Sequence, residues 1–216
     1  MSRGAMNNVE RIGLIALYAF TFVAVFGYGT FALHPERLPD TDFARNFFAN
    51  SFAWSSRAHI ILSGLVLAAA FFRRAGVRWL VAFASVFVLS FLAEHIGTGT
   101  GFPFSGYEYT GLLGPRIGER VPWVIPMSWF LMAAPSWILA RHTFPTRTGA
   151  RLAFATYLLV LWDVALDPAM SHLVLYWQWE VPGPYYGMPW VNFAGWAGTG
   201  IVLMAALELL DRRIDW

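Results

Sequence analysis

Two acidic residues stand inside one apolar stretch of the chain. Asp163 and Asp167 lie four residues apart in LLVLWDVALDP, so in a helix both project from one face about one turn apart. Two carboxyls so close in an apolar medium cannot both stay ionised, and one is expected to be held neutral. A neutral carboxyl beside a carboxylate suits general acid chemistry. Asp167 precedes Pro168, so organising the helix end is the alternative interpretation for it.

A second ionisable pair, Glu94 and His95, lies near the end of another apolar stretch, VLSFLAEHIG. An ionisable group at such depth is costly unless it faces a cavity or a partner, so the pair marks a candidate site. The alternative for both residues is a helix end whose polar groups reach the membrane interface.

Glycine-rich and aromatic segments follow these stretches. GTGTGFPFSGYEYTGLLGPRIGERVP has no preceding strand and no lysine in the P-loop position, so it is not a phosphate-binding loop. Its glycines predict a backbone that folds back over the mouth of the bundle and brings Tyr107, Glu108 and Tyr109 towards the carboxyls. The segment ending in GPYYGMPWVNF is expected to deliver Asn192 as a hydrogen-bonding group from the other side.

The elements that position these residues are predicted to be membrane helices. Hydrophobic residues make up 57% of the 216 residues and charged residues 13%, well below the roughly 25% of a soluble domain. The chain is therefore expected to be an all-α, polytopic integral membrane helical bundle with about six transmembrane helices, forming a single domain over 1–216. The predicted spans are 12–33, 58–72, 77–97, 122–140, 152–170 and 193–210. Long connections are expected at 34–57, 98–121 and 171–192, and short ones at 73–78 and 141–151.

The distribution of arginine predicts an orientation. All 15 basic residues are arginine, and an N-terminus placed inside puts ten of them on the cytoplasmic side and five outside. This predicts a cytoplasmic N-terminus, long aromatic loops on the outer face, and a multi-pass protein of the cell (inner or plasma) membrane. The first apolar block has no cleavage motif behind it and is expected to be retained. The arginines form no run or stripe, so no nucleic-acid partner is expected.

The sequence lacks the residues that several kinds of cofactor chemistry require. Cysteine is absent, and the five histidines form no pair at helical spacing, which argues against thiolate, iron–sulfur and di-iron sites. No dinucleotide fingerprint is present. We therefore expect neither a metal nor a cofactor, which leaves acid chemistry or proton-coupled transport.

A short motif occurs twice. Pro122-Trp123-Val124 followed by Trp129 matches Pro189-Trp190-Val191 followed by Trp196, with identical spacing at the start of two predicted spans. This indicates two similarly oriented helical hairpins related by an axis along the membrane normal, although a Trp-rich chain can produce such a match by chance.

Three blocks, in order, carry a family resemblance: EHIGTGTGFPFSGYEYTGLLGPRIGERVPWVIPMSWF, WDVALDPAM and WEVPGPYYGMPWVNFAGW. Together they resemble the membrane-bound carotenoid biosynthesis family, which includes bacterial and archaeal carotenoid 1,2-hydratases acting on γ-carotene-type and bisanhydrobacterioruberin-type substrates. The resemblance covers about residues 90–200, and residues 1–89 agree only in hydropathy.

The resemblance implies addition of water to the terminal 1,2 double bond of an acyclic carotenoid, giving a tertiary alcohol without a cofactor. Its partners would be a long-chain carotenoid, water, the bilayer and other carotenoid biosynthesis enzymes. We expect Asp163 or Glu94 to protonate C-2, and Asp167 or the unprotonated partner to deprotonate water. Aromatic faces would stabilise the cation at C-1. The candidates for binding substrate, cation or water are His95, Tyr107, Glu108, Tyr109, Trp129, Asn192 and Trp196.

Two other functions stay open on the sequence. A carotenoid end-group cyclase begins with the same protonation and lets a neighbouring double bond capture the cation. A proton-coupled transporter or pigment-binding membrane protein would use the same acids as a relay.

Overall fold

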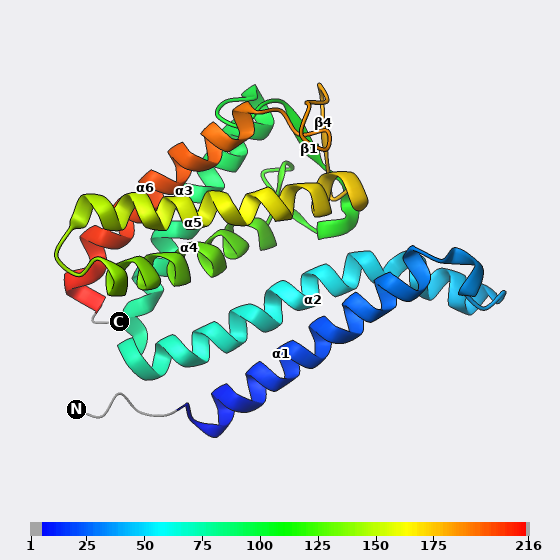
Figure 1. Cartoon of the computed structure of the whole chain (residues 1–216), viewed down its shortest axis with the longest axis horizontal. Helices are drawn as coiled ribbons and strands as arrows, with labels where there is room; N and C mark the ends of the chain where they lie inside the picture. The colour runs from blue at the N-terminus through cyan, green and yellow to red at the C-terminus, as the bar shows by residue number, and fades with distance from the viewer. Residues whose placement is uncertain (1–5, 215–216) are drawn as a thin grey trace. The chain divides into compact units, whose positions relative to one another are not determined.

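The computed structural model describes residues 6–214, and this part of the chain is mainly helical (Figure 1). Its α-helices are α1 (Asn8–Gly27), α2 (Asp42–Ala75), α3 (Trp79–Thr100), α4 (Val124–Thr143), α5 (Thr148–Asp167) and α6 (Val191–Ile214). Five helical runs among the described residues are long and apolar enough to cross a membrane, and one of them, Asp42–Thr100, contains both α2 and α3. The predicted all-α membrane bundle with about six spans is confirmed.

Short elements connect the helices. The strands are β1 (Tyr107–Tyr109), β2 (Arg116–Ile117), β3 (Val121–Pro122) and β4 (Trp177–Trp179). Two short segments are π-helical, η1 (Tyr28–Ala32) and η5 (Pro168–Leu173). Three are 3₁₀ turns, η2 (Pro35–Arg37), η3 (Gly76–Arg78) and η4 (Gly111–Leu113).

The chain divides into two compact units, with the boundary after Arg73. The first unit is an antiparallel hairpin of α1 and α2. α1 begins with a capping box, in which Asn7 and Glu10 satisfy each other's backbone N–H groups. The buried Glu10 carboxylate also accepts two hydrogen bonds from Arg73, at 2.8 and 2.9 Å, near the end of α2. This bidentate pair fixes the register of the two helices.

The expected long loop at 34–57 is wrong for most of its length, because α2 begins at Asp42. The Thr41 side chain accepts a hydrogen bond from the first turn, at 3.2 Å from the Ala44 nitrogen. The segment is too polar to be recognised by hydropathy, but aromatic rings four residues apart pack along it, as Phe48 and Phe52 do at 5.4 Å.

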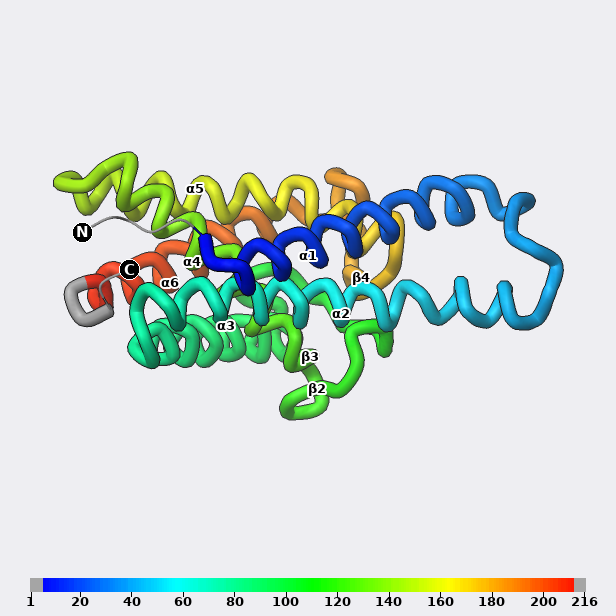
Figure 2. The backbone as a smooth tube through the Cα atoms, turned by 90° about the horizontal axis from the view of Figure 1, so that it is seen from below, coloured from blue at the N-terminus to red at the C-terminus, as the bar shows by residue number. Residues whose placement is uncertain are grey.

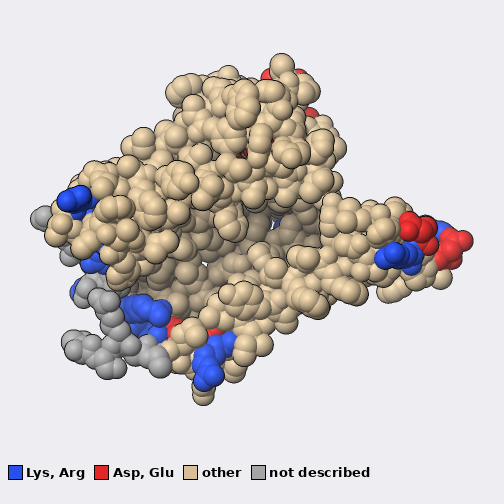
Figure 3. All heavy atoms as spheres, viewed as in Figure 1, with Lys and Arg blue, Asp and Glu red and all other residues tan. Residues whose placement is uncertain are grey.

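The second unit contains α3, α4, α5 and α6, and each of these helices packs against its neighbours (Figures 1 and 2). The short connection after α4 lies at one end of this unit, and the two long connections that carry β1 and β4 lie at the other. The core is aromatic and aliphatic, with fully buried Trp129, Trp137, Leu203 and Leu207. On the face shown in Figure 3, the charged atoms of each unit gather at the ends of its helices, and uncharged atoms cover the lengths between them.

A two-stranded ribbon joins the two long connections of the second unit. β1 pairs with β4 in antiparallel register, with Glu108 opposite Gln178 at its centre. Further hydrogen bonds flank the ribbon, including Thr110 N–H to the Tyr176 carbonyl at 2.9 Å and Glu180 N–H to the Gly106 carbonyl at 2.9 Å. We call this ribbon, together with residues 101–106, the roof.

The two copies of the repeated motif occupy equivalent places in the second unit. α4 begins at Val124 and α6 at Val191, the third residue of each copy. The fourth matched positions, Trp129 and Trp196, stack on each other with ring centroids 4.1 Å apart. The helical hairpins α3–α4 and α5–α6 therefore contact each other at matched positions of the motif, and the symmetry axis expected from the repeat stays a prediction.

Candidate carboxyl site

Glu94 lies on α3 one turn before Thr98 and points into the second unit. Its Oε1 accepts a hydrogen bond from the Trp129 indole N–H at 2.8 Å, and its Oε2 accepts from the Tyr109 hydroxyl at 2.6 Å and from the Tyr107 hydroxyl. Only 5% of Glu94 is exposed. Three donors aimed at two oxygens are the environment of a fixed carboxylate, because an ionised carboxyl is an acceptor only.

The two phenols come from β1 in the roof, where residues alternate between buried and exposed. Burial, reinforced by the adjacent Glu94 carboxylate, raises the pKa of Tyr107 well above its ordinary value. Burial and the same carboxylate raise the pKa of Tyr109 in the same way. Both phenols therefore keep their protons at physiological pH and act as hydrogen-bond donors.

Asp163 and Asp167 lie on α5 and share one partner, Asn192, at the start of α6. The Asn192 amide donates to Asp163 Oδ2 at 3.1 Å and to Asp167 Oδ2 at 3.0 Å. All three residues are almost completely buried, with exposed fractions of 0%, 2% and 2%. The predicted i, i+4 arrangement places both carboxyls on one face of the helix, and Asn192 bridges them.

The two aspartates differ in how their second oxygens are satisfied. Asp167 Oδ1 accepts a hydrogen bond from the Ser171 hydroxyl at 2.7 Å, and the Trp179 indole N–H donates in turn to that hydroxyl at 3.3 Å. Asp163 Oδ1 is buried and has no hydrogen-bond partner. A buried carboxyl oxygen without a protein partner is unfavourable, so it is a position where a reactive group or a small ligand is expected.

The Glu94 and Asp163–Asp167 clusters lie close enough for electrostatic interaction. The charge of Glu94 acts on both aspartates, and the charge of Asp167 acts on Asp163. The stacked rings of Trp129 and Trp196 line the site, and Phe104 lies 6.3 Å from the Trp129 ring. The result is one buried acidic site with aromatic walls, beneath the roof.

Two predicted site residues lie elsewhere. Glu108 is the exposed middle residue of β1, so its side chain points away from Glu94. His95 follows Glu94 on α3 but turns towards the connection after β2, where a side-chain carbon on Gly118 would be 3.2 Å from its ring. His95 Nδ1 is buried without a partner there. The structure brings the remaining eight predicted residues together and leaves these two apart.

The structure adds three residues that the sequence did not suggest. Ser171 and Trp179 complete the hydrogen bonds of Asp167, and the Asn192 amide lies 2.8 Å from the Met188 sulfur. Ser171 lies four residues after Asp167, and this spacing was its only signal in the sequence. Trp179 reaches the site only through the pairing of β4 with β1.

Among the described residues, no three histidine or acidic side chains are grouped so that they could hold a metal ion. The two oxygens of Glu94 already accept hydrogen bonds from three protein donors, which occupy most of the acceptor positions of that carboxylate. The expectation of a site without metal or cofactor stays a prediction.

The apolar helical runs, the charge at their ends and the buried acidic site define a multi-pass α-helical membrane protein with a buried carboxyl centre. The model of a family described as "Carotenoid biosynthesis protein" matches residues 56–215. The chain belongs to this family, as its three motif blocks predict. The match takes in both carboxyl clusters.

One relative has a name that describes an activity. A bisanhydrobacterioruberin hydratase of Haloarcula japonica is 32% identical to this chain over 146 residues, which cover 66% of this chain and 47% of the relative. The match thus takes in about half the length of that relative. No solved structure matches the chain significantly.

Proposed function

We propose that this protein adds water to the terminal carbon–carbon double bond of an acyclic carotenoid end group and produces a tertiary alcohol. The observation that carries the proposal is the fully buried Asp163, whose Oδ1 has no partner while Asp167 and Asn192 lie beside it. The family match and the hydratase relative support the same reaction.

Asp163 is assigned as the acid. Its carboxyl proton passes to C-2 of the double bond, the π electrons form the new C–H bond, and a tertiary cation remains at C-1. Glu94 is less suited to this step because both of its oxygens accept hydrogen bonds. General acid catalysis of this kind contributes about 10²–10⁴-fold to a rate.

The walls of the site suit a carbocation. The faces of Trp129 and Trp196 provide π electrons that attract positive charge without bonding to it. The fixed Glu94 carboxylate adds a negative charge that needs no reorganisation during the reaction. Tyr107 and Tyr109 hold that carboxylate in place.

Asp167 is assigned as the base. A water molecule held near Asn192 attacks C-1, and Asp167 accepts the proton that the water loses. Transfer of this proton to Asp163, which shares the Asn192 amide with Asp167, restores the starting state. The overall reaction adds H and OH across one double bond, with no change in oxidation state and no cofactor.

The two other functions predict different outcomes. A cyclase would use the same acid, but Asp167 and Asn192 beside Asp163 favour water as the nucleophile. A proton-coupled transporter would use a chain of ionisable groups across the membrane, whereas these three buried acids gather at the roof end of the second unit.

Expression in cells that accumulate an acyclic carotenoid, followed by mass analysis of the pigments, tests the proposal. We expect a mass gain of one water for each modified end. New products of unchanged mass would identify a cyclase, and unchanged pigment across several acyclic carotenoids would contradict the proposal. Asp163→Asn is the inactive control. The same proposal places the protein in the cell (inner or plasma) membrane. It also includes association with other carotenoid biosynthesis enzymes.

A further inference from the structure

The roof closes the carboxyl site at the end where the long connections lie. β1 and β4 are joined by backbone hydrogen bonds, and the Thr110 hydroxyl donates to the Leu175 carbonyl at 2.8 Å. A long apolar substrate is more stable in the bilayer than in water, so a path that leaves the bilayer and crosses this hydrogen-bonded ribbon is unfavourable. The substrate must therefore reach Asp163 between helices.

At three of the helix–helix seams of the second unit, side chains fill the space between the helices. Phe104 lies between α3 and α6, where a side-chain carbon on Gly97 would be 2.8 Å from its ring and one on Gly195 would be 2.6 Å from it. Between α5 and α6, a carbon on Gly200 would lie 3.2 Å from Leu159. Between α3 and α4, the rings of Phe83 and Phe130 meet at 5.2 Å.

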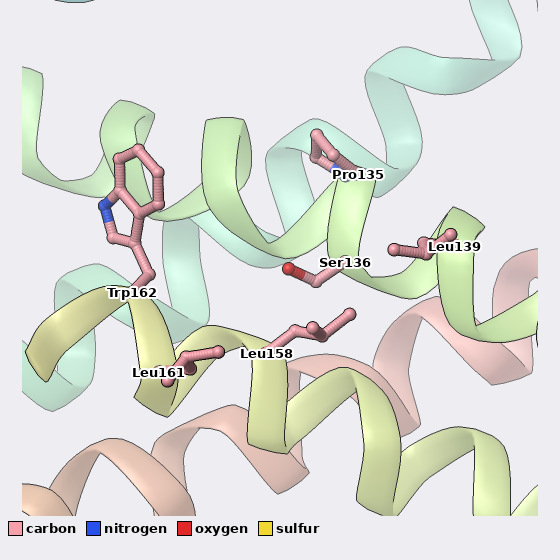
Figure 4. A pocket seen from close by; sticks show the side chains of 6 residues that line it. All are labelled: Pro135, Ser136, Leu139, Leu158, Leu161 and Trp162. Carbon is pink, nitrogen blue, oxygen red and sulfur yellow. The ribbon is translucent and has the colours of Figure 1, made fainter.

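The seam between α4 and α5 contains a hollow of about 320 Å³. Figure 4 shows its lining side chains, with Trp162 at one end and Leu139 at the other. The lining residues are Pro135, Ser136 and Leu139 of α4 and Leu158, Leu161 and Trp162 of α5. The Ser136 hydroxyl is the single polar side-chain group among them, apart from the indole N–H of Trp162.

The hollow adjoins the acid. Trp162 and Asp163 are consecutive residues of α5, so their side chains leave the helix about 100° apart. Trp162 is 56% exposed and Asp163 is 0% exposed. The hollow and the buried carboxyl therefore lie on neighbouring sides of α5.

We propose that this hollow binds the stretch of isoprenoid chain next to the reacting end group, and that acyclic carotenoids enter the site from the bilayer through the α4–α5 seam. This inference rests on the proposed function. Leucine side chains, a proline and an indole face match a methyl-branched polyene, and the volume lies in the range of small-molecule sites. A lipid acyl chain is the alternative occupant, but it carries no terminal alkene that could react at Asp163.

The test fills the hollow and measures binding separately from chemistry. Ser136→Phe places a ring on the α4 wall, and Leu161→Trp does so from α5 at a lining position that is 48% exposed. Ser85→Phe is the matched control, because Ser85 is another serine of a membrane helix, hydrogen-bonded within α3 and outside the hollow. Purified wild type and variants are incubated with a full-length acyclic carotenoid and with a short isoprenoid carrying the same end group. Bound pigment and product are then quantified.

We expect Ser136→Phe and Leu161→Trp to lower binding and conversion of the full-length carotenoid by about tenfold. Conversion of the short isoprenoid should change little, and Ser85→Phe should behave as wild type. Equal binding of the carotenoid by all four proteins would overturn the inference. So would a result in which filling the hollow displaces bound phospholipid but leaves carotenoid binding unchanged. Binding that depends on the hollow without any product would leave the inference standing and would refute the proposed hydration.

Discussion

At the scale of single residues, the three buried acids are not equivalent. Glu94 accepts three hydrogen bonds, whereas Asp163 accepts one and leaves Oδ1 unpartnered. A carboxylate surrounded by donors is stabilised as an anion, and a carboxyl with a free oxygen has room to carry and release a proton. Substitution of Asp163 should therefore affect mainly product formation, and substitution of Glu94 should affect mainly the stability of the protein.

Asp163→Asn should abolish product formation while the protein stays folded. The amide is isosteric, its oxygen can accept from Asn192, and its NH₂ group can take the place of Oδ1. We expect conversion to fall by about a hundredfold or more, the contribution of a general acid. Pigment analysis and thermal unfolding in detergent measure the two effects. Wild-type conversion by Asp163→Asn would show that another group donates the proton.

Glu94→Gln should instead destabilise the protein. The new NH₂ group would face donors, and at least one of Tyr107, Tyr109 and Trp129 would lose its acceptor in a buried place. The expected loss is about 1–3 kcal/mol of unfolding free energy, with reduced activity. Glu108→Gln, on the exposed side of the same strand, is the control and should leave both unchanged. A fully stable Glu94→Gln variant would contradict the hydrogen bonding described for Glu94.

The phenols give the protein an alkaline limit. Because the pKa of Tyr107 and of Tyr109 is raised in the folded protein, their contribution to stability is complete below the unfolded value of about 10. Above that pH the unfolded state binds fewer protons than the folded state, so stability falls as pH rises. Thermal unfolding between about pH 8 and about pH 11, on either side of that value, should show this decline. The Tyr107→Phe, Tyr109→Phe double variant should show a shallower decline, and an equal slope would refute this origin.

The sequence predicted much of the site because its residues combine an ionisable type with an apolar setting. Asp163, Asp167 and Glu94 are conspicuous for this reason, and i, i+4 spacing alone places the aspartates together. Ser171 was missed because serine is unremarkable near a helix end. The outward direction of Glu108 depends on strand alternation in β1, which could not be seen in a segment of three residues.

At the scale of elements, the roof is positioned by glycines on two helices. A side-chain carbon on Gly195 of α6 would lie 2.6 Å from Phe104 and 2.7 Å from the Pro103 carbonyl. The turn that leads into β1 can therefore approach α6 only because position 195 has no side chain. Gly198, one turn further along α6, has nothing within 4 Å of such a carbon.

Gly195→Val should displace Phe104 and the turn that carries it. We expect a loss of about 1–3 kcal/mol of stability from overpacking, together with lower activity because Tyr107 and Tyr109 follow the same turn. Gly198→Val is the matched control on the same helix and should cost only the smaller difference in helix propensity. Thermal unfolding of the purified variants compares them. Equal stability of the two would show that the turn is not held against Gly195.

Most helices were predictable from hydropathy, because a run of about 20 apolar residues has the length needed to cross the hydrocarbon core of a bilayer. The boundaries of α3, α4 and α6 lie close to the predicted ones. The first half of α2 was missed because its asparagines, serines and charges lower the hydropathy. The ribbon of β1 and β4 was also beyond prediction, since its pairing is long-range and each strand has three residues.

At the scale of the whole molecule, the two compact units contribute unequally to the site. The hairpin of α1 and α2 carries its own ion pair, between the buried Glu10 and the more exposed Arg73, whereas every acid of the candidate site belongs to the second unit. The single transmembrane domain expected from the sequence stays a prediction, as does the cytoplasmic N-terminus.

The absence of cysteine from the sequence makes the orientation directly testable. Glu119→Cys lies between β2 and β3, and Thr146→Cys lies in the short connection after α4; both positions are exposed. In intact cells a membrane-impermeant thiol reagent should label Glu119→Cys alone, and Thr146→Cys should react only after the cells are opened. The wild-type chain is the unlabelled control. The reverse pattern would place the N-terminus outside.

The pairing of β1 with β4 also determines when the site can form during synthesis of the protein. β1 leaves the ribosome well before its partner, and α4 and α5 are synthesised in between. Until β4 has been synthesised, the strand that carries Tyr107 and Tyr109 has no partner, and Ser171 lacks the hydrogen bond from Trp179. The site is therefore assembled only after the penultimate helix has been inserted. A chain interrupted before β4 would hold Glu94 in the membrane without the ribbon that covers it.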